Sequence, residues 1–216
     1  MKIGIIGSGV VGQTLAQGFS AEGHQVMLGT RDTGKQEVRD FAKSNPLIKT
    51  GTFAQAADYG EVLVLATKGS VTESAIGLAG TEKFTGKTVI DATNPIDGRP
   101  PTNGVLHYFT SLEESLMERL QALLPEAKLV KAFNSVGNAY MYKPAFEMKP
   151  TMFICGNDAA AKITVTHILD SFGWETADMG SAASARAIEP LCMLWCIPGM
   201  LYNKWSHAFK LMKAGK

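Results

Sequence analysis

The feature that most constrains the fold of this chain is a glycine-rich motif near its N-terminus. The sequence GSGVVG at residues 7–12 matches G-x-G-x-x-G, directly follows an apolar run at residues 3–6 and opens a helical pattern at residues 10–21. The first glycine permits a tight turn, the second lets the backbone approach a pyrophosphate, and the third lets helix and strand pack closely. The motif therefore predicts a dinucleotide site, and a tight turn without a ligand is the alternative.

The rest of the chain alternates short apolar runs with longer helical patterns. Strands are expected at residues 3–6, 25–29, 48–50, 62–66, 88–91, 128–130, 152–154 and 174–176. Helices are expected at residues 10–21, 32–44, 70–78, 112–124 and 159–172, and residues 96–108 read as a long loop. This alternation predicts an α/β chain of the Rossmann type, with a doubly wound, mostly parallel sheet and helices on both faces.

The last part of the chain differs from this pattern. We expect residues 1–180 to form one Rossmann-type domain and residues 181–216 a short helical appendage, broken near Pro190 and again at Pro198-Gly199. Its apolar side chains are expected to pack on the core or against a partner chain, which predicts a homodimer. Lining the reactive end of the site is the less favoured alternative for them.

Composition excludes several classes of partner. The chain has 21 basic and 20 acidic residues and a formal net charge of +1, so it has no field that would attract nucleic acid or an anionic membrane. No apolar run reaches the roughly 20 residues that cross a bilayer. Three cysteines, an odd number, argue against a disulfide framework. These observations predict a cytoplasmic protein with neither a nucleic-acid nor a membrane partner.

The end of the second expected strand indicates which dinucleotide binds. Sites for NAD usually carry an acidic residue there, which accepts hydrogen bonds from the ribose 2′-hydroxyl. This chain has Gly29-Thr30-Arg31 instead, followed by Lys35. A threonine hydroxyl and two cations suit the 2′-phosphate of NADP, although a solvated surface charge is the alternative for Arg31. Asp32 is expected to cap the following helix rather than to face the ribose.

Residues that would indicate other chemistry are scarce. The pattern Tyr-x-x-x-Lys of short-chain dehydrogenases is not found after Tyr140 or Tyr142. Cys192 and Cys196 share a helix face without further ligands nearby, so we expect a core position and no metal site. Arg186 and Glu189 are three residues apart and are expected to pair on their helix. Hydride transfer between two rings needs positioning rather than an acid, base or nucleophile, so no catalytic side chain is predicted.

At this point the sequence resembles a known family. Beside the N-terminal motif and Gly29-Thr30-Arg31, three later segments carry the resemblance: DATNP at 91–95, KAFNS at 131–135, and DMGS at 178–181 leading to ARAIEP at 185–190. Together they are similar to the NADP oxidoreductases that use the deazaflavin coenzyme F420, and to the cytosolic NADPH domain of STEAP-type metalloreductases. The STEAP-type proteins continue into a membrane haem domain that this sequence does not contain.

The resemblance implies where NADP(H) binds. It assigns the pyrophosphate, the 2′-phosphate, and the ribose with the nicotinamide to three groups of residues in turn. These are Gly7, Ser8, Gly9, Val10, Val11 and Gly12; then Thr30, Arg31 and Lys35; then Ala66, Thr67, Lys68, Asn94, Pro95, Phe133 and Asn134.

The resemblance also implies a reaction. It predicts an NADPH-dependent oxidoreductase that transfers a hydride between NADP(H) and a small-molecule acceptor, either coenzyme F420 or a flavin. One alternative is a sensor or scaffold that binds NADPH without turnover, with the reactive end blocked by Trp195 or by the loop around His107. The other is a reductase of a small carbonyl or imine, with Lys68, Tyr140 or His107 as the proton donor.

Overall fold

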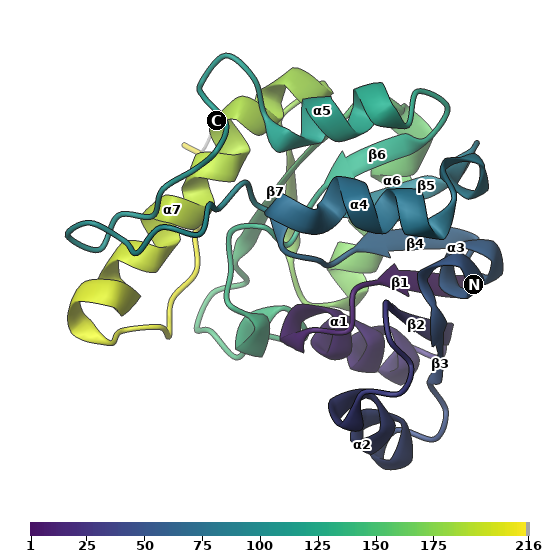
Figure 1. The fold of residues 1–216 in the computed structure, drawn as a ribbon. Coiled ribbons are helices and arrows are strands. Elements are labelled where there is room, and N and C mark those ends of the chain that lie inside the picture. The colour runs from purple at the N-terminus through teal and green to yellow at the C-terminus, as the bar shows by residue number, and fades with distance from the viewer. Residues whose placement is uncertain (215–216) are drawn as a thin grey trace.

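A computed structural model describes residues 1–214 of the chain. Its strands form one sheet in the order β3-β2-β1-β4-β5-β6-β7-β8 (Figure 1). All neighbours in this sheet are parallel except β6 and β7, which run antiparallel. The expected doubly wound, mostly parallel sheet is therefore confirmed. The strands are β1 (Lys2–Ile6), β2 (Gln25–Thr30), β3 (Lys49–Thr52), β4 (Val62–Leu65), β5 (Thr88–Asp91), β6 (Lys128–Lys131), β7 (Thr151–Gly156) and β8 (Glu175–Asp178).

Helices cover both faces of the sheet. They are α1 (Val10–Ala21), α2 (Gln36–Ser44), α3 (Phe53–Tyr59), α4 (Gly69–Ala79), α5 (Leu116–Leu123), α6 (Ala159–Ser171) and α7 (Ala185–Tyr202). One buried cluster joins α1, α2 and α6 to one face, and a second joins α3, α4, α5 and the start of α7 to the other. Successive strand residues alternate between the two clusters, as in Val62 and Leu63, because side chains along a strand point to opposite faces.

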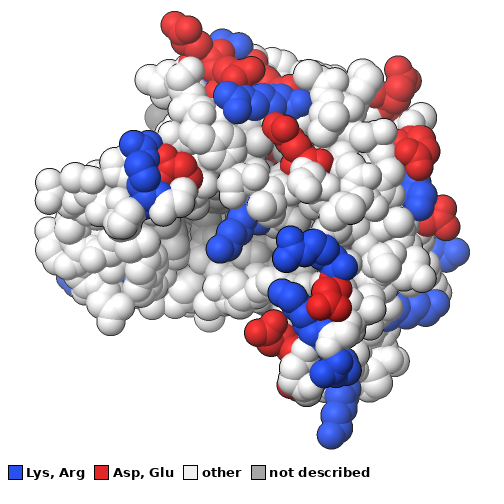
Figure 2. Space-filling view, in the orientation of Figure 1, with Lys and Arg blue, Asp and Glu red and all other residues white. Residues whose placement is uncertain are grey.

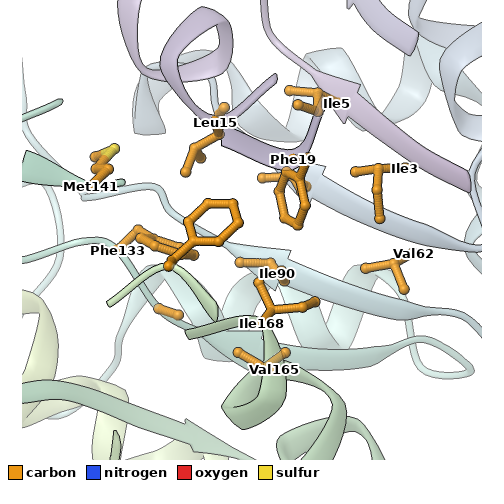
Figure 3. Close-up of a cluster of buried hydrophobic side chains, with 14 of the residues drawn as sticks. Ile3, Ile5, Leu15, Phe19, Val62, Ile90, Phe133, Met141, Val165 and Ile168 are labelled. Atoms are coloured by element: carbon orange, nitrogen blue, oxygen red, sulfur yellow. The ribbon is translucent and has the colours of Figure 1, made fainter. Parts of the chain in front are cut away.

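The first of these clusters contains the largest aromatic side chains of the core. Figure 3 shows Leu15 and Phe19 of α1 together with Phe133, which follows β6. The rings of Phe19 and Phe172 lie 4.9 Å apart between centroids, and those of Phe133 and Phe172 lie 5.8 Å apart. This packing fixes α1 on the sheet, so the glycine-rich turn before α1 has a rigid support.

The helices differ from the local expectations in three places. The second helix begins at Gln36 rather than at residue 32, because residues 31–35 form a turn. Helix α3 was not predicted at all, although Thr52 and Gln55 form a reciprocal capping box at its start. The predicted helix at 112–124 is present only from Leu116 to Leu123.

The C-terminal part also departs from expectation. Helix α7 runs without a break through Pro190 and Pro198 and ends at Tyr202. Each proline removes one helical hydrogen bond, but the carbonyls concerned belong to Arg186 and Leu194, whose exposed positions let water replace the lost donor. Helix α7 projects from the body of the molecule, at the left of Figure 1.

Residues 203–214 form an irregular strap instead of the expected helix, while residues 215–216 lie outside the described part. The strap returns from the end of α7 to the sheet. Trp195 Nε1 donates to the His207 carbonyl at 2.8 Å, and the Thr151 N–H donates to the Phe209 carbonyl at 2.9 Å. The division of the chain at residue 180 stays a prediction. Among residues 1–214 we find no helix with the length and apolar content that a bilayer crossing requires.

Candidate functional site

A cavity of about 600 Å³ opens at the carboxyl ends of β1, β2 and β4. Figure 2 shows Lys and Arg side chains gathered beside the hollow at the centre of this face, while the projecting lobe on its left side carries few charges. Predicted site residues that line the cavity are Gly7, Ser8, Gly9, Val10, Val11, Thr30, Arg31, Lys35, Ala66, Thr67 and Lys68. The structure therefore brings together three segments that are far apart in sequence.

The three glycines of the turn have different surroundings. Gly7 has φ +133°, and a Cβ on it would lie 2.4 Å from the Ala66 carbonyl oxygen. A Cβ on Gly12 would lie 1.9 Å from the Gly7 carbonyl oxygen. In contrast, a Cβ on Gly9 meets nothing within 4 Å. Gly7 and Gly12 are thus required by packing, whereas the space beside Gly9 is a cradle that a side chain would fill.

The start of α1 next to this cradle suits an anion. Gly9 is the N-cap residue, and no side chain caps the first N–H groups of the helix. The first turn also carries no acidic residue. Uncapped N–H groups and the positive end of the helix dipole favour a phosphate at this position. The turn therefore fits the pyrophosphate of a dinucleotide.

The loop after β2 is held in place by a short chain of hydrogen bonds. Ser8 Oγ donates to Thr30 Oγ1 at 3.0 Å, and Thr30 Oγ1 donates to the Asp32 carbonyl at 3.3 Å. Thr30 is only 3% exposed, so its hydroxyl joins the two phosphate-binding segments as well as lining the cavity. Its predicted bond to a 2′-phosphate stays a prediction.

Asp32 is an acidic residue near the position where an NAD site carries one. It was expected to cap the following helix, and that expectation was wrong. The N-cap of α2 is Lys35, and Asp32 Oδ1 instead accepts the Gly34 N–H at 2.8 Å. This turn engages the carboxylate within the loop, while the Arg31 and Lys35 side chains line the cavity. Charge and geometry together fit a ligand with an added phosphate.

The other predicted residues lie beyond the lining of the cavity. Asn94 Nδ2 donates to the Asn134 carbonyl at 2.8 Å, and Asn134 Nδ2 donates to the Ile188 carbonyl at 2.9 Å. These bonds join the ends of β5 and β6 to the start of α7. The Phe133 side chain is buried in the core, contrary to the expectation that it faces a ligand, and its φ is +62°. Pro95 is buried as well.

Three charged side chains lie fully buried behind this second region. Lys131 Nζ is 2.7 Å from Asp91 Oδ2, 2.9 Å from Glu189 Oε1, and donates to the Thr93 carbonyl at 2.9 Å. Burial disfavours the charged form of Lys131, but the two carboxylates outweigh it and raise its pKa. The expected pairing of Arg186 with Glu189 is therefore wrong.

Arg186 pairs with α5 instead. Its Nη2 lies 2.7 Å from Glu118 Oε1, and its Nε also donates to both oxygens of that carboxylate. The Arg186 guanidinium, together with the N–H and hydroxyl of Ser115, lowers the pKa of Glu118 to about 2. Arg186 and Glu189 thus dock α7 on the body through separate partners.

The structure adds residues that the sequence did not indicate. Six further residues line the cavity: Phe53, Val71, Ser74, Ala75, Leu78 and Ala92. Val71 and Leu78 are exposed apolar residues of α4, and Phe53 opens the helix that was not predicted. The sequence signal that could have indicated these residues was the presence of apolar side chains on the predicted helix at 70–78. In the described part of the chain, no group of three or more His, Cys, Asp or Glu could hold a metal.

A mostly parallel, doubly wound sheet with a glycine-rich turn after its first strand defines the Rossmann class of dinucleotide-binding proteins. Within that class, residues 2–95 match the family described as NADP oxidoreductase, coenzyme F420-dependent. The crystal structure of a putative F420-dependent NADP-reductase from Arthrobacter sp. FB24 is 31% identical, with a TM-score of 0.93 over 99% of this chain and 100% of that one. This chain belongs to the family of coenzyme F420-dependent NADP oxidoreductases.

Two curated relatives extend this comparison. The F420-dependent NADP reductase of Methanocaldococcus jannaschii is 28% identical over 211 residues, which cover 90% of each chain. Metalloreductase STEAP3 of Rattus norvegicus is 31% identical over 205 residues, which cover 93% of this chain. The match spans only 39% of the length of STEAP3.

Proposed function

We propose that this chain transfers a hydride between NADP(H) and a deazaflavin or flavin-like acceptor. The observation that carries the proposal is the cavity itself, in which an open cradle at Gly9 lies on one wall with Arg31 and Lys35. A neutral backbone cradle fits a pyrophosphate, and the two cations fit an additional phosphate. The names of the matching family and of two relatives support NADP and a deazaflavin as the two substrates.

Each part of the cavity has a proposed role. The α1 N-terminus and Gly7–Gly12 hold the pyrophosphate, and Thr30, Arg31 and Lys35 hold the 2′-phosphate. The apolar wall of Phe53, Val71 and Leu78 suits the flat adenine ring. We assign the nicotinamide and its ribose to the ends of β4, β5 and β6, near Thr67, Lys68 and Asn94.

Hydride transfer between two rings needs no reacting side chain from the protein. NADPH, when bound, supplies the hydride, and the protein must hold two rings in contact and keep water out. We propose that the cross-linked ends of β5 and β6, joined by Asn94 and Asn134, give the reactive end its fixed shape. We assign no catalytic acid, base or nucleophile.

The structure bears on the two alternatives. Trp195 lies against Gly137 and stacks on His207, and it does not line the cavity, which favours an enzyme over a sensor with a plugged cavity. Of the three proton donors considered for a carbonyl or imine reductase, Lys68 lines the cavity, whereas His107 hydrogen-bonds Thr102 and Tyr140 packs on Phe146.

The proposed partners follow from the surface. Leu194, Met200, Leu201 and Tyr202 of α7 are between 43% and 67% exposed on the nearly uncharged lobe of Figure 2. We propose that this lobe forms a homodimer interface, that the protein is cytoplasmic, and that it binds neither nucleic acid nor membranes. Light scattering at micromolar concentration tests the dimer, and a monomeric mass would refute it.

The test of the proposed function is NADPH oxidation by the purified protein, with and without a deazaflavin. We expect the near-ultraviolet absorbance of NADPH to fall rapidly only when the deazaflavin is present, and to fall much more slowly with NADH. Tight NADPH binding without oxidation by a deazaflavin or a flavin would refute the acceptor and leave the NADP site in place. No binding of NADPH would refute the proposal as a whole.

A further inference from the structure

The buried cluster of Asp91, Lys131 and Glu189 has an unbalanced charge. These side chains are 0%, 0% and 1% exposed, respectively. One ammonium group faces two carboxylates, at 2.7 and 2.9 Å, so the cluster carries a formal charge of −1. A single ion pair would have been neutral. The second carboxylate therefore needs an explanation beyond pairing Lys131.

The neighbours of the cluster present hydrogen-bond donors to both carboxylates. Asp91 Oδ1 accepts the N–H and the hydroxyl of Thr93 at 2.9 and 2.6 Å. The two Glu189 oxygens accept the N–H groups of Leu116 and Met117, each at 3.0 Å, at the start of α5. Three of the four oxygens thus accept hydrogen bonds, whereas Asp91 Oδ2 makes only its ion-pair contact with the Lys131 ammonium. The α5 dipole offsets only about half a charge.

The cluster lies directly behind one end of the candidate site. Asp91 ends β5, the next residue, Ala92, lines the cavity, and Lys131 Nζ bonds the carbonyl of Thr93. The cations Arg31 and Lys35 follow β2, which is three strands away in the order β2-β1-β4-β5. At about 4.8 Å per strand, the two charged regions are roughly 14 Å apart across the sheet. The site is therefore positive at one end and has a buried negative charge behind the other.

We propose that this buried negative cluster favours a cationic ring at the β5–β6 end of the cleft, and so stabilises bound NADP⁺ relative to bound NADPH. The inference rests on the proposed function, which assigns the nicotinamide to that end. Loss of a hydride, which is one proton with two electrons, leaves the ring with a charge of +1. A unit charge about 10 Å away in an interior with an effective dielectric constant of about 20 changes the relative affinity about tenfold.

A purely structural role for the cluster makes a different prediction. If Glu189 only docked α7 on α5, its loss would weaken both forms of the cofactor equally. The exposed pair of Arg186 and Glu118 joins the same two helices without placing charge behind the cavity. Glu118→Gln is therefore a matched control, which loosens the docking but leaves the buried charge unchanged.

The experiment compares dissociation constants for NADPH and NADP⁺, measured by isothermal titration calorimetry, in four proteins. These are the wild type, Glu189→Gln, Asp91→Asn and Glu118→Gln. We expect the ratio Kd(NADP⁺)/Kd(NADPH) to rise about tenfold in each of the two charge-neutralising variants and to stay within about twofold in the control. The readout is binding alone and does not depend on the acceptor.

The outcomes are separable. An unchanged ratio in a folded Glu189→Gln or Asp91→Asn protein, or an equal change in Glu118→Gln, overturns the inference while the NADP site stands. If neither neutralised variant folds, the wild type decides, because the cluster requires NADP⁺ to bind at least as tightly as NADPH. A wild type that prefers NADPH by about tenfold or more contradicts it. A wild type that binds neither form refutes the proposed function, and the inference with it.

Discussion

Replacing Gly9 by alanine separates the proposed binding role of the glycine-rich turn from its structural role. Gly9 has φ −73° and ψ 179°, which alanine adopts without strain. A Cβ there meets nothing within 4 Å in the protein itself. The substitution therefore leaves the fold intact but fills the cradle that we assign to the pyrophosphate.

The structure sets the sign and size of the effects of Gly9→Ala on stability and on NADPH binding. Because alanine has fewer unfolded conformations than glycine, the free energy of unfolding should stay equal or rise by about 0.4–1 kcal/mol. The added methyl group displaces the phosphate from backbone N–H donors. Loss of one hydrogen bond to a charged group costs about 1.5–3 kcal/mol, so the Kd for NADPH should rise roughly 10- to 150-fold.

Two other glycines provide matched controls. Gly77 lies exposed in α4, and its Cβ position is also open, so Gly77→Ala should stabilise the helix by about 0.5–1 kcal/mol without changing the Kd for NADPH. A Cβ on Gly12 would lie 1.9 Å from the Gly7 carbonyl oxygen, so Gly12→Ala should lower the free energy of unfolding by about 1–3 kcal/mol or more.

The assay combines urea unfolding of each variant with titration of NADPH by fluorescence. The expected pattern is a stable Gly9→Ala protein that binds weakly, a stable Gly77→Ala protein that binds normally, and an unstable Gly12→Ala protein. Gly9→Ala binding as tightly as the wild type would show that no phosphate occupies the cradle. If Gly9→Ala unfolded as easily as Gly12→Ala, the space beside Gly9 would not be open in the folded protein.

Three further predictions concern charged groups. Removing Arg31 or Lys35 should weaken NADPH binding, and reduce its dependence on salt, while leaving NADH binding unchanged; a parallel loss for both cofactors would contradict the 2′-phosphate site. Lys131→Met leaves two buried carboxylates unpaired and should lower the free energy of unfolding by about 3–5 kcal/mol, measured in urea; a loss below about 1 kcal/mol would argue against the triad. Arg186 is the main cause, with Ser115, that lowers the pKa of Glu118 from 4.5 to about 2, so the stability that the Arg186–Glu118 pair contributes is present above pH 4.5 and lost as pH falls towards 2. The difference in Tm between wild type and Arg186→Ala should therefore disappear across that range, and a constant difference would exclude the pair as its source.

Local signals explain what could be predicted from the sequence. The apolar run of β1, the glycines of the turn and the helical period of α1 lie within about 20 consecutive residues, so one pass along the chain identifies all three. The strand β4 is apolar throughout, because both of its faces are buried, and β5 has the apolar pair Val89-Ile90 at its centre. Thr30, Arg31 and Lys35, which the same local logic assigned to the 2′-phosphate, line the cavity, and their contact with a phosphate stays a prediction.

Other elements were missed because tertiary packing overrides local preference. Helix α3 has only seven residues, too few for a helical period to show against the neighbouring strands. The prolines of α7 predicted two breaks, but the helix is continuous and packed on both sides of Pro198: Trp195 lies against Gly137, and Trp205 of the strap lies against Gly199. The strap itself has no sequence signal, because its hydrogen bonds reach Thr151, more than 50 residues earlier.

The acidic residues of the site show most clearly where a sequence stops being informative. Asp32 stands beside the expected ribose position and was expected to cap the next helix, but its carboxylate accepts the Gly34 N–H instead. Glu189 stands three residues from Arg186 and predicts a helical pair, yet its partners are Lys131 and the start of α5, 58 and more residues away. A carboxylate acts through whatever lies within hydrogen-bonding distance. The negative charge of Glu189 can therefore be predicted from the sequence. The groups on which that charge acts are fixed only by the packing of α5, β6 and α7. For this reason the charge behind the reactive end, which local patterns treat as an ordinary salt bridge, emerges only when all three elements are in place.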